Sequence, residues 1–252
     1  MQTDKTLYIV GPCSIENHFT AHRTLSGIVK TMEGKEWYFK GSFDKANRTT
    51  IEGLRGPGLE YSIHIFKSLK KEFPGVKFIT DVHETHQVKE LVGIVDAIQI
   101  PAFLCKQTDL IVEAAKHFDK INIKKGQWIS PKTVVGAISK VRSVNHDAEI
   151  WVTERGMQVG YGHLVVDFAA VEYLKEHFDR VIFDVTHSTQ RVNEDGRNGG
   201  DYKMAKKYFK AASIFGYDGI FCETHPEPYR ALSDQDSMIP TAEFLELMKE
   251  RK

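Results

Sequence analysis

The stretch DAIQIPAFLCKQTDLIVEAAKHFDKINIK, residues 96–124, contains one complete unit of the pattern that decides the fold. It begins with a short apolar run, Asp96–Ile100, continues through a helix-like segment, Leu110–His117, and ends with a second run, Lys120–Lys124. Short runs that are apolar nearly throughout are typical of strands buried on both faces of a parallel sheet. The stretch therefore predicts a strand–helix–strand unit with parallel strands.

The same unit recurs along the chain. Strands are expected at Leu7–Val10, Glu36–Lys40, Lys77–Thr80, Asp96–Ile100, Lys120–Lys124, Glu149–Thr153, Val181–Val185 and Asp218–Cys222. Helices are expected at His18–Met32, Gly58–Glu72, His86–Val92, Leu110–His117, Pro131–Val144, Leu164–Glu176, Tyr202–Phe215 and Thr241–Glu250. Eight such repeats in 252 residues predict an α/β fold, a single (β/α)8 TIM barrel that occupies residues 1–252 as one domain.

Composition excludes several classes of function. The chain has 34 Lys+Arg and 34 Asp+Glu, so its formal net charge is zero and it has no electrostatic reason to bind nucleic acid or an anionic membrane. No run approaches the roughly 18 apolar residues of a membrane span, and no signal peptide is recognised. The three cysteines, Cys13, Cys105 and Cys222, are widely separated and odd in number, which suits a reducing compartment. We expect a cytoplasmic protein.

Ionisable residues follow the carboxyl ends of the predicted strands, where the loops of a barrel meet over one mouth. The cationic members of this set are Lys40, Lys45, Arg48, Lys124 and Arg155. Because five positive charges in one mouth repel one another unless anions neutralise them, these residues predict a site for phosphate-bearing ligands. Two phosphate groups fit the number of cations better than one.

A second set of strand-end residues has the donor types of a metal site. It offers one thiolate, one imidazole and two carboxylates from different loops, at Cys13, His187, Glu223 and Asp234. This mixture suits Fe(II), Mn(II), Zn(II) or Co(II) and is poor for Mg(II). The residues alone leave the alternative open that Cys13 is simply a small buried hydrophobe.

The loop Ser188–Tyr202 has several glycines and asparagines near its end and no apolar periodicity. Such a segment is typical of a mobile surface loop, and a lid over the mouth is one role for it.

Together these strand-end segments resemble the class I 3-deoxy-ald-2-ulosonate phosphate synthases, and above all their octulosonate-forming branch. The matching motifs cover almost the whole chain in the family's order. They are GPCSIE (11–16), KGSFDKANRT (40–49), RGPGLE (55–60), TDVHE (80–84), QIPAFLCKQTDL (99–110), IKKGQ (123–127), ERG (154–156), GYGHLVVD (160–167), FDVTHSTQ (183–190) and ETHPEP…LSD (223–234).

The resemblance implies a transferase reaction in which phosphoenolpyruvate condenses with D-arabinose 5-phosphate and water. The products are 3-deoxy-D-manno-octulosonate 8-phosphate and inorganic phosphate, for lipopolysaccharide or capsule biosynthesis. It also implies a homotetramer. Cysteine after Gly-Pro marks the members that need a divalent metal, so Cys13 implies a metal held by the four donors named above.

Substrate contacts are also implied residue by residue. Phosphoenolpyruvate is expected at Lys45, Gln99, Lys124 and Arg155, with Lys40 near its carboxylate and reacting carbon. The aldose phosphate is expected at Asn47, Arg48 and Thr49. Lys106 stands where a neighbouring subunit of the family usually supplies an arginine. The candidates for moving protons are His83, His187 and Asp234, because histidine in particular titrates close to neutrality.

Two segments depart from the family pattern. Gly160–His163 replaces a Gly-Tyr-Asn step, and Gly199–Lys203 replaces a Gly-Gly-Gln-Arg-Glu-Phe stretch. These departures concern the aldose half of the reaction. The alternatives are erythrose 4-phosphate, as in heptulosonate synthases, and a capsule-specific sugar, although Asn47 argues for the longer arabinose 5-phosphate. A non-catalytic barrel is a remote alternative, since no strand-end cation or metal ligand is missing.

Overall fold

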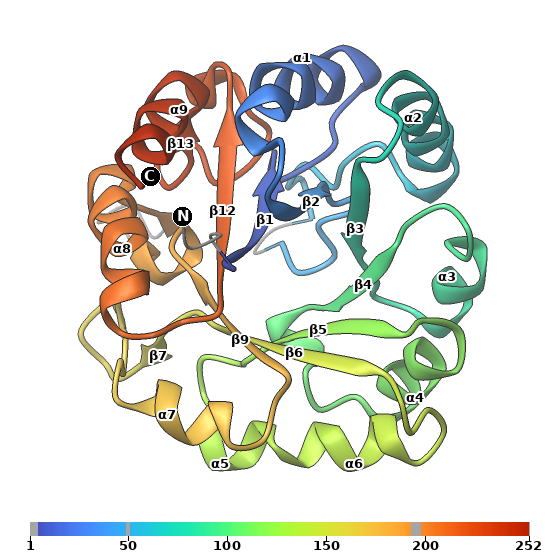
Figure 1. The fold of residues 1–252 in the computed structure, drawn as a ribbon, viewed down its shortest axis with the longest axis vertical. Helices are drawn as coiled ribbons and strands as arrows, with labels where there is room; N and C mark the ends of the chain where they lie inside the picture. The colour runs from blue at the N-terminus through green and yellow to red at the C-terminus, as the bar shows by residue number, and fades with distance from the viewer. Residues whose placement is uncertain (1–4, 49–50, 193–197, 252) are drawn as a thin grey trace.

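In the computed structural model, which describes residues 5–48, 51–192 and 198–251, eight parallel strands close into a barrel (Figure 1). Hydrogen bonds between the first strand and the last barrel strand complete the ring. The strands are β1 (Leu7–Gly11), β2 (Glu36–Lys40), β3 (Lys77–Asp81), β4 (Ala97–Ile100), β5 (Lys120–Lys124), β6 (Glu149–Glu154), β9 (Arg180–Asp184) and β12 (Gly219–His225). The (β/α)8 barrel predicted from the sequence is confirmed.

Helices surround the ring of strands (Figure 1). They are α1 (His18–Ile28), α2 (Leu59–Glu72), α3 (Thr85–Glu90), α4 (Thr108–His117), α5 (Pro131–Val134), α6 (Gly136–Arg142), α7 (Ala170–Lys175), α8 (Tyr202–Ile214) and α9 (Thr241–Glu250). Short 3₁₀ turns lie at η1 (Val29–Met32), η2 (Ala102–Leu104), η3 (His187–Thr189) and η4 (Pro228–Arg230). None of the helices in the described ranges has the length and apolar character that crossing a membrane requires.

Three predicted helices were wrong in part. The first ends at Ile28, and η1 continues to Met32. The segment Pro131–Val144 is divided into α5 and α6 around Val135 and Gly136, because valine and glycine are poor helix formers. The segment Leu164–Glu176 differs most from the predicted helix. Its first residues, Leu164–Val165, form a strand, β8, that pairs antiparallel with β7 (Met157–Gln158). Pairing with another segment overrides the helical pattern there, and α7 begins only at Ala170.

Side-chain alternation along the strands positions the site. Leu7 and Ile9 belong to a core cluster inside the barrel, whereas Tyr8 and Val10 join the larger core between the strands and the helices. The same alternation in β2 turns Tyr38 inward, so Lys40 also faces the inside of the barrel at its carboxyl end. A register slip of one residue would move such a lysine out of the mouth.

The segment Ser188–Tyr202 is more ordered than predicted where the structure describes it. Ser188 and Thr189 are buried in η3, and β10 (Arg191–Val192) pairs antiparallel with β11 (Asn198–Gly199). The Thr189 hydroxyl accepts a hydrogen bond from the amide of Asp201 at 3.2 Å, which links the two ends of the loop. Residues 193–197 lie outside the described part of the chain, so the predicted lid stays a prediction.

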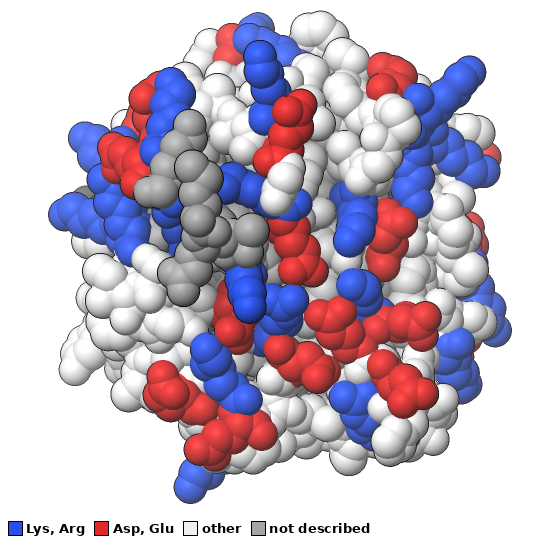
Figure 2. Space-filling model, viewed as in Figure 1, with Lys and Arg blue, Asp and Glu red and all other residues white. Residues whose placement is uncertain are grey.

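Charge is mixed on the face of the molecule that is in view in Figure 2. Figure 2 shows Lys and Arg side chains interspersed with Asp and Glu side chains over the face in view, without a large area of one sign. This agrees with a formal net charge of zero.

Candidate active site

A pocket of about 720 Å³ opens at the carboxyl ends of the barrel strands. The five cations that the sequence places there, Lys40, Lys45, Arg48, Lys124 and Arg155, all line it. The sequence prediction that these residues converge is confirmed. Arg191, on β10, is a further cationic residue of the lining that the prediction missed.

Lys40 is held deep in this pocket by several acceptors. Its Nζ donates hydrogen bonds to the hydroxyl of Ser42 at 2.6 Å and to the carbonyl of Cys13 at 3.2 Å. It also lies 3.5 Å from Asp81 and 3.7 Å from Glu223. Because Lys40 is almost completely buried, these partners fix the ammonium in one position.

Lys124 is paired in a similar way. Its Nζ donates to a carboxylate oxygen of Asp184, and the same oxygen lies 2.8 Å from Nδ1 of His187. The Lys124 ammonium also lies 3.6 Å from the centroid of the Phe221 ring. Burial lowers the pKa of Lys124, while His187 and Lys124 hold the pKa of Asp184 below its usual range although burial opposes this. Asp184 therefore orients both a cation and an imidazole.

Arg155 is connected through Gln190 to the loop that follows β12. The guanidinium donates to the amide oxygen of Gln190, whose amide nitrogen donates to Asp234 at 2.8 Å. Burial lowers the pKa of Arg155. Gln190 thus joins a cation expected to bind substrate to a residue expected to bind metal.

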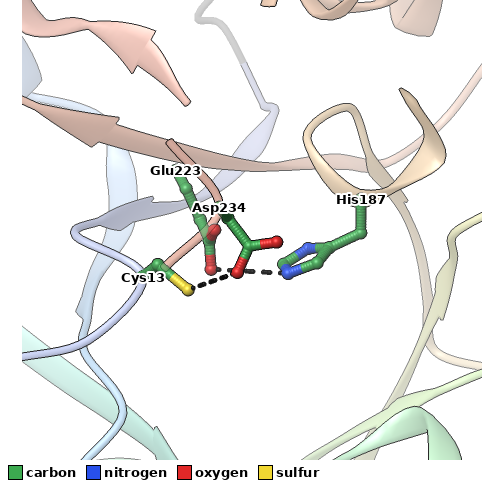
Figure 3. A group of neighbouring side chains, drawn as sticks. All are labelled: Cys13, His187, Glu223 and Asp234. Carbon is green, nitrogen blue, oxygen red and sulfur yellow. Dashed lines mark hydrogen bonds and ion pairs between the residues drawn. The ribbon is translucent and has the colours of Figure 1, made fainter. Parts of the chain in front are cut away.

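The four predicted metal ligands come together. Their donor atoms, on Cys13, His187, Glu223 and Asp234, all lie within 4.8 Å of one another. Figure 3 shows the four side chains converging from separate segments of the chain. Cys13 and Glu223 are buried, and His187 and Asp234 are partly exposed towards the pocket.

Hydrogen bonding within this group leaves out the Glu223 carboxylate, although its Oε1 lies 3.7 Å from Nζ of Lys40 and 3.7 Å from Nε2 of His187. The Cys13 thiol donates to Asp234 at 3.0 Å and accepts from the hydroxyl of Ser233 at 2.9 Å. Neither carboxylate oxygen of Glu223 has a hydrogen-bond partner among the described residues, although the side chain is buried. Burial, with Asp234 and Glu223 nearby, raises the pKa of the Cys13 thiol well above its usual value.

His83 lines the pocket beside Asp81. Its Nε2 lies 3.3 Å from a carboxylate oxygen of Asp81, and its Nδ1 is buried without a hydrogen-bond partner among the described residues. Phe43 packs edge-on against the imidazole, with ring centroids 5.7 Å apart. The imidazole is therefore oriented on one side by a carboxylate and on the other by an aromatic ring.

Most of the remaining predicted substrate contacts lie in the same pocket. Gln99 is buried and accepts a hydrogen bond from Asn122 at 3.0 Å, while Asn47 is exposed at the rim. Arg48 donates to the carbonyl of Leu54 at 2.8 Å. Thr49 lies outside the described residues.

Lys106 is the exception. It is exposed and does not belong to the described lining of the pocket, and its carbonyl accepts a hydrogen bond from Lys140 at 2.7 Å. Within a single chain the structure does not bring Lys106 to the predicted phosphate site.

The clustered cations were expected to need anionic ligands, but buried carboxylates already neutralise two of them. Lys40 is paired with Asp81 and Glu223, and Lys124 with Asp184, so these two cations do not need a ligand to neutralise them. Lys45, Arg48 and Arg155 form no ion pair with a carboxylate in the described ranges. Although burial opposes it, the anionic groups near Lys45 raise the pKa of its ammonium, so it stays charged. Three cations thus remain available to anionic ligands.

Several residues of the site were missed by the sequence reasoning. Asp81 and Asp184 end β3 and β9, so their position at strand ends was a usable signal, but no role was assigned to them. Gln190 lay in the segment expected to be a mobile loop. The β7–β8 hairpin, which lines the pocket through Gly160–Leu164, fell in a segment expected in part to be a helix.

Asp81 predicts an acid-dependent loss of stability. Burial raises the pKa of its carboxyl, but Lys40 and His83 lower it more, so the folded pKa lies well below the usual value. Such a group stabilises the fold above its unfolded pKa of about 3.9, and that contribution is lost as pH falls through the folded pKa. We expect the melting temperature of Asp81→Asn to be less sensitive to pH below about 4 than that of the unsubstituted chain. Parallel pH profiles of the two proteins would contradict this.

Comparisons with known proteins place the site in context. The model of the DAHP synthetase I family matches residues 2–252. A protein of Wolinella succinogenes named 2-dehydro-3-deoxyphosphooctonate aldolase is 44% identical over 246 residues, which cover 92% of this chain and 93% of the relative.

Two further relatives carry the same name. The protein of Helicobacter hepaticus is 42% identical over 254 residues, covering 95% of this chain and 93% of the relative. The protein of Campylobacter jejuni strain RM1221 is 42% identical over 248 residues, covering 93% of this chain and 91% of the relative. The family match, over residues 2–252, includes all the strands that supply the pocket.

Proposed function

The chain belongs to the DAHP synthetase I family, and we propose that it condenses phosphoenolpyruvate with D-arabinose 5-phosphate and water. The products are 3-deoxy-D-manno-octulosonate 8-phosphate and inorganic phosphate. The observation that carries the proposal is one pocket in which Lys40, Lys45, Arg48, Lys124 and Arg155 converge beside a group of metal-ligand types. The name shared by the three relatives favours this reaction over the erythrose 4-phosphate and non-catalytic alternatives.

The chemistry explains why the pocket is cationic. C3 of phosphoenolpyruvate forms a bond to the aldehyde carbon of the sugar, while the oxygen of water becomes bonded to C2 and phosphate leaves. The two reactants are anions that repel each other, so the site must hold them in reactive geometry and offset their charges. Lys45, Arg48 and Arg155, which lack a carboxylate partner among the described residues, are suited to this task.

We assign the substrates to two regions of the mouth. Phosphoenolpyruvate is placed at Lys45, Gln99, Lys124 and Arg155, with Lys40 towards its carboxylate and reacting carbon. The aldose phosphate is placed at the rim, at Asn47 and Arg48, while Thr49, the third predicted contact, lies outside the described residues. The supporting observation is depth, because Lys40, Gln99, Lys124 and Arg155 are buried whereas Asn47 is exposed.

Three residues are proposed to hold or move protons. His83 and His187 each have one ring nitrogen close to a buried carboxylate, Asp81 in one case and Asp184 in the other. Such a carboxylate fixes the orientation of the imidazole. The second nitrogen of His187 lies 3.7 Å from Oε1 of Glu223, and that of His83 is buried. Asp234 also contacts the pocket, and Lys45 and His187 hold the pKa of its carboxyl below the usual range although burial opposes this. It is therefore an acceptor at neutral pH.

We further propose that Cys13, His187, Glu223 and Asp234 hold a divalent Mn, Fe, Zn or Co ion. The fit rests on the two oxygens of Glu223, which are buried without a hydrogen-bond partner among the described residues, and on four donor atoms that lie within 4.8 Å of one another. Leaving such polar atoms buried and unsatisfied costs free energy, which a bound cation offsets. When bound, the ion supplies a Lewis acid for the aldehyde oxygen or for water.

A homotetramer is proposed as the working assembly. Lys106 is exposed and lies outside the pocket of its own chain, which supports a role at the site of a neighbouring subunit. Lysine keeps the charge of an arginine there but lacks its bidentate geometry. The cytoplasm is the proposed location, because the three cysteines are free and buried, and free thiols persist in a reducing compartment.

A panel of aldose phosphates tests the proposed reaction. Phosphate release from phosphoenolpyruvate is measured with erythrose 4-phosphate, arabinose 5-phosphate and six-carbon aldose phosphates. We expect kcat/KM to be at least about tenfold higher for arabinose 5-phosphate than for the others, since a site built around substrate hydroxyls discriminates strongly against ligands that lack them. A preference for erythrose 4-phosphate would establish the heptulosonate alternative instead.

A further inference from the structure

A buried ion pair lies behind the pocket wall, at the carboxyl ends of β5 and β6. Nζ of Lys125 is 3.5 Å from Oε1 of Glu154, and their side chains are 0% and 1% exposed. Lys125 follows Lys124, and Glu154 precedes Arg155, so each charged residue of the pair adjoins a cation of the pocket. Because side chains alternate along extended backbone, the pair faces the outer side of the barrel while Lys124 and Arg155 face the mouth.

Each member of the pair is bonded to the loop that follows its strand. Nζ of Lys125 donates to the carbonyls of Gly126 at 3.4 Å and Ile129 at 3.3 Å. Oε1 of Glu154 accepts from the amides of Arg155 at 2.9 Å and Gly156 at 2.7 Å. The ion pair therefore joins the loop after β5 to the loop after β6.

Gly156 lies in the loop after β6, next to Arg155. Its φ of 88° lies in the left-handed region, and a Cβ there would be 3.1 Å from Cβ of Leu164 in β8. The turn held by Glu154 thus contains Arg155 and leads directly into the β7–β8 hairpin, which lines the pocket. The Gln158 amide adds a hydrogen bond of 2.9 Å to the carbonyl of Gln127 in the loop after β5.

Stability alone does not account for the pair. Removing two charges from water costs several kcal/mol per ion, and a packed apolar pair is often as stable or more stable. Oε2 of Glu154 has no hydrogen-bond partner in the described part of the chain, so that cost is only partly offset. What the ion pair contributes is position, because it fixes the two loops relative to each other.

We propose that Lys125 and Glu154 are positioning residues for phosphoenolpyruvate, which set the spacing of Lys124 and Arg155. The inference rests on the proposed function, because those two cations are assigned there to one substrate. It goes beyond that assignment by giving a role to two residues that do not belong to the described lining of the pocket.

The chain offers a matched control on the same two strands. Lys120 and Glu149 are opposite one another where β5 and β6 begin, with Nζ and Oε2 3.1 Å apart and side chains 32% and 29% exposed. We call Lys125–Glu154 the rim pair and Lys120–Glu149 the floor pair. The floor pair joins the same strands at the end away from the pocket.

The test compares Lys125→Met/Glu154→Gln with Lys120→Met/Glu149→Gln. Glutamine keeps an oxygen that accepts the two amide hydrogen bonds, so the rim variant removes the ion pair together with the hydrogen bonds from Lys125 to the carbonyls of Gly126 and Ile129. The Kd of phosphoenolpyruvate is measured by calorimetry without aldose, together with the KM of arabinose 5-phosphate, kcat and melting temperature. We expect the rim variant to bind phosphoenolpyruvate at least about tenfold more weakly, because small misplacements of binding groups have large effects.

In the same experiment the KM of arabinose 5-phosphate is expected to change by less than about twofold, and the floor variant is expected to keep both constants within that range. The single variant Lys125→Arg, which keeps the positive charge beside Glu154, is expected to keep most of the affinity for phosphoenolpyruvate. Should the rim double variant fail to fold, Glu154→Gln alone is measured in the same way.

An unchanged Kd in the rim variant, or equal losses in the rim and floor variants, would overturn the positioning role. Absence of phosphate release from the unsubstituted chain would instead refute the proposed function. The two failures are therefore distinguishable.

Discussion

Replacing Lys124 by alanine is expected to lower kcat/KM for phosphoenolpyruvate by about a thousandfold, because truncating one partner of a buried charged contact costs about 3 to 5 kcal/mol. Lys124 is buried, contacts Asp184 and lies beside His187 in the pocket. Its loss removes a cation from the substrate and leaves the Asp184 carboxylate with fewer partners. Steady-state kinetics with phosphoenolpyruvate as the varied substrate measures the effect.

Lys120→Ala is the control for this substitution. Lys120 begins the same strand at the end away from the pocket and is partly exposed. We expect its kcat/KM to stay within about twofold of the unsubstituted value, as for a distant surface site. If Lys124→Ala kept normal kinetics while folding normally, the proposed position of phosphoenolpyruvate would be wrong.

Removal of divalent metal is expected to abolish turnover, and addition of Mn(II), Fe(II), Zn(II) or Co(II) is expected to restore it. Chelation would leave the thiol, imidazole and two carboxylates of Cys13, His187, Glu223 and Asp234 without the cation that we propose they share. Polarising a carbonyl oxygen is worth several kcal/mol to a reaction of this kind, so the loss should exceed about a hundredfold. Turnover is compared before chelation, after chelation and after each ion is added back.

A spectroscopic readout separates metal binding from activity. Co(II) bound through a thiolate gives a sulfur-to-metal charge-transfer absorption, which Cys13→Ser is expected to lose. Full turnover in excess chelator, with no metal left in the protein, would refute metal dependence.

The fold was largely predictable because its signal is local and repeated. Strands such as Glu36–Lys40 and Lys120–Lys124 agree with the predicted bounds to the residue, since short runs rich in aromatic and β-branched residues recur between helix-like segments. The β7–β8 hairpin was missed because each of its strands has only two residues. Pairing between such short segments depends on tertiary contacts that have no periodicity in the sequence.

The site was predictable in its members but less so in its electrostatics. Residues at strand ends could be assigned to the mouth from topology alone, which is why Lys40 and Lys124 were correctly placed there. Their pairing with Asp81 and Asp184 could not be read from the sequence, because it depends on which side chains meet across the barrel. The outward-facing rim pair, Lys125 and Glu154, was hidden for the same reason.

The measurement that tests the central claim most directly is a crystal structure of the protein with phosphoenolpyruvate and a non-reactive analogue of arabinose 5-phosphate. The account predicts phosphoenolpyruvate between Lys124 and Arg155, with the analogue's phosphate at Arg48 and its aldehyde end directed inward. Phosphoenolpyruvate bound elsewhere at full occupancy, with Lys124 and Arg155 free of ligand, would contradict the account.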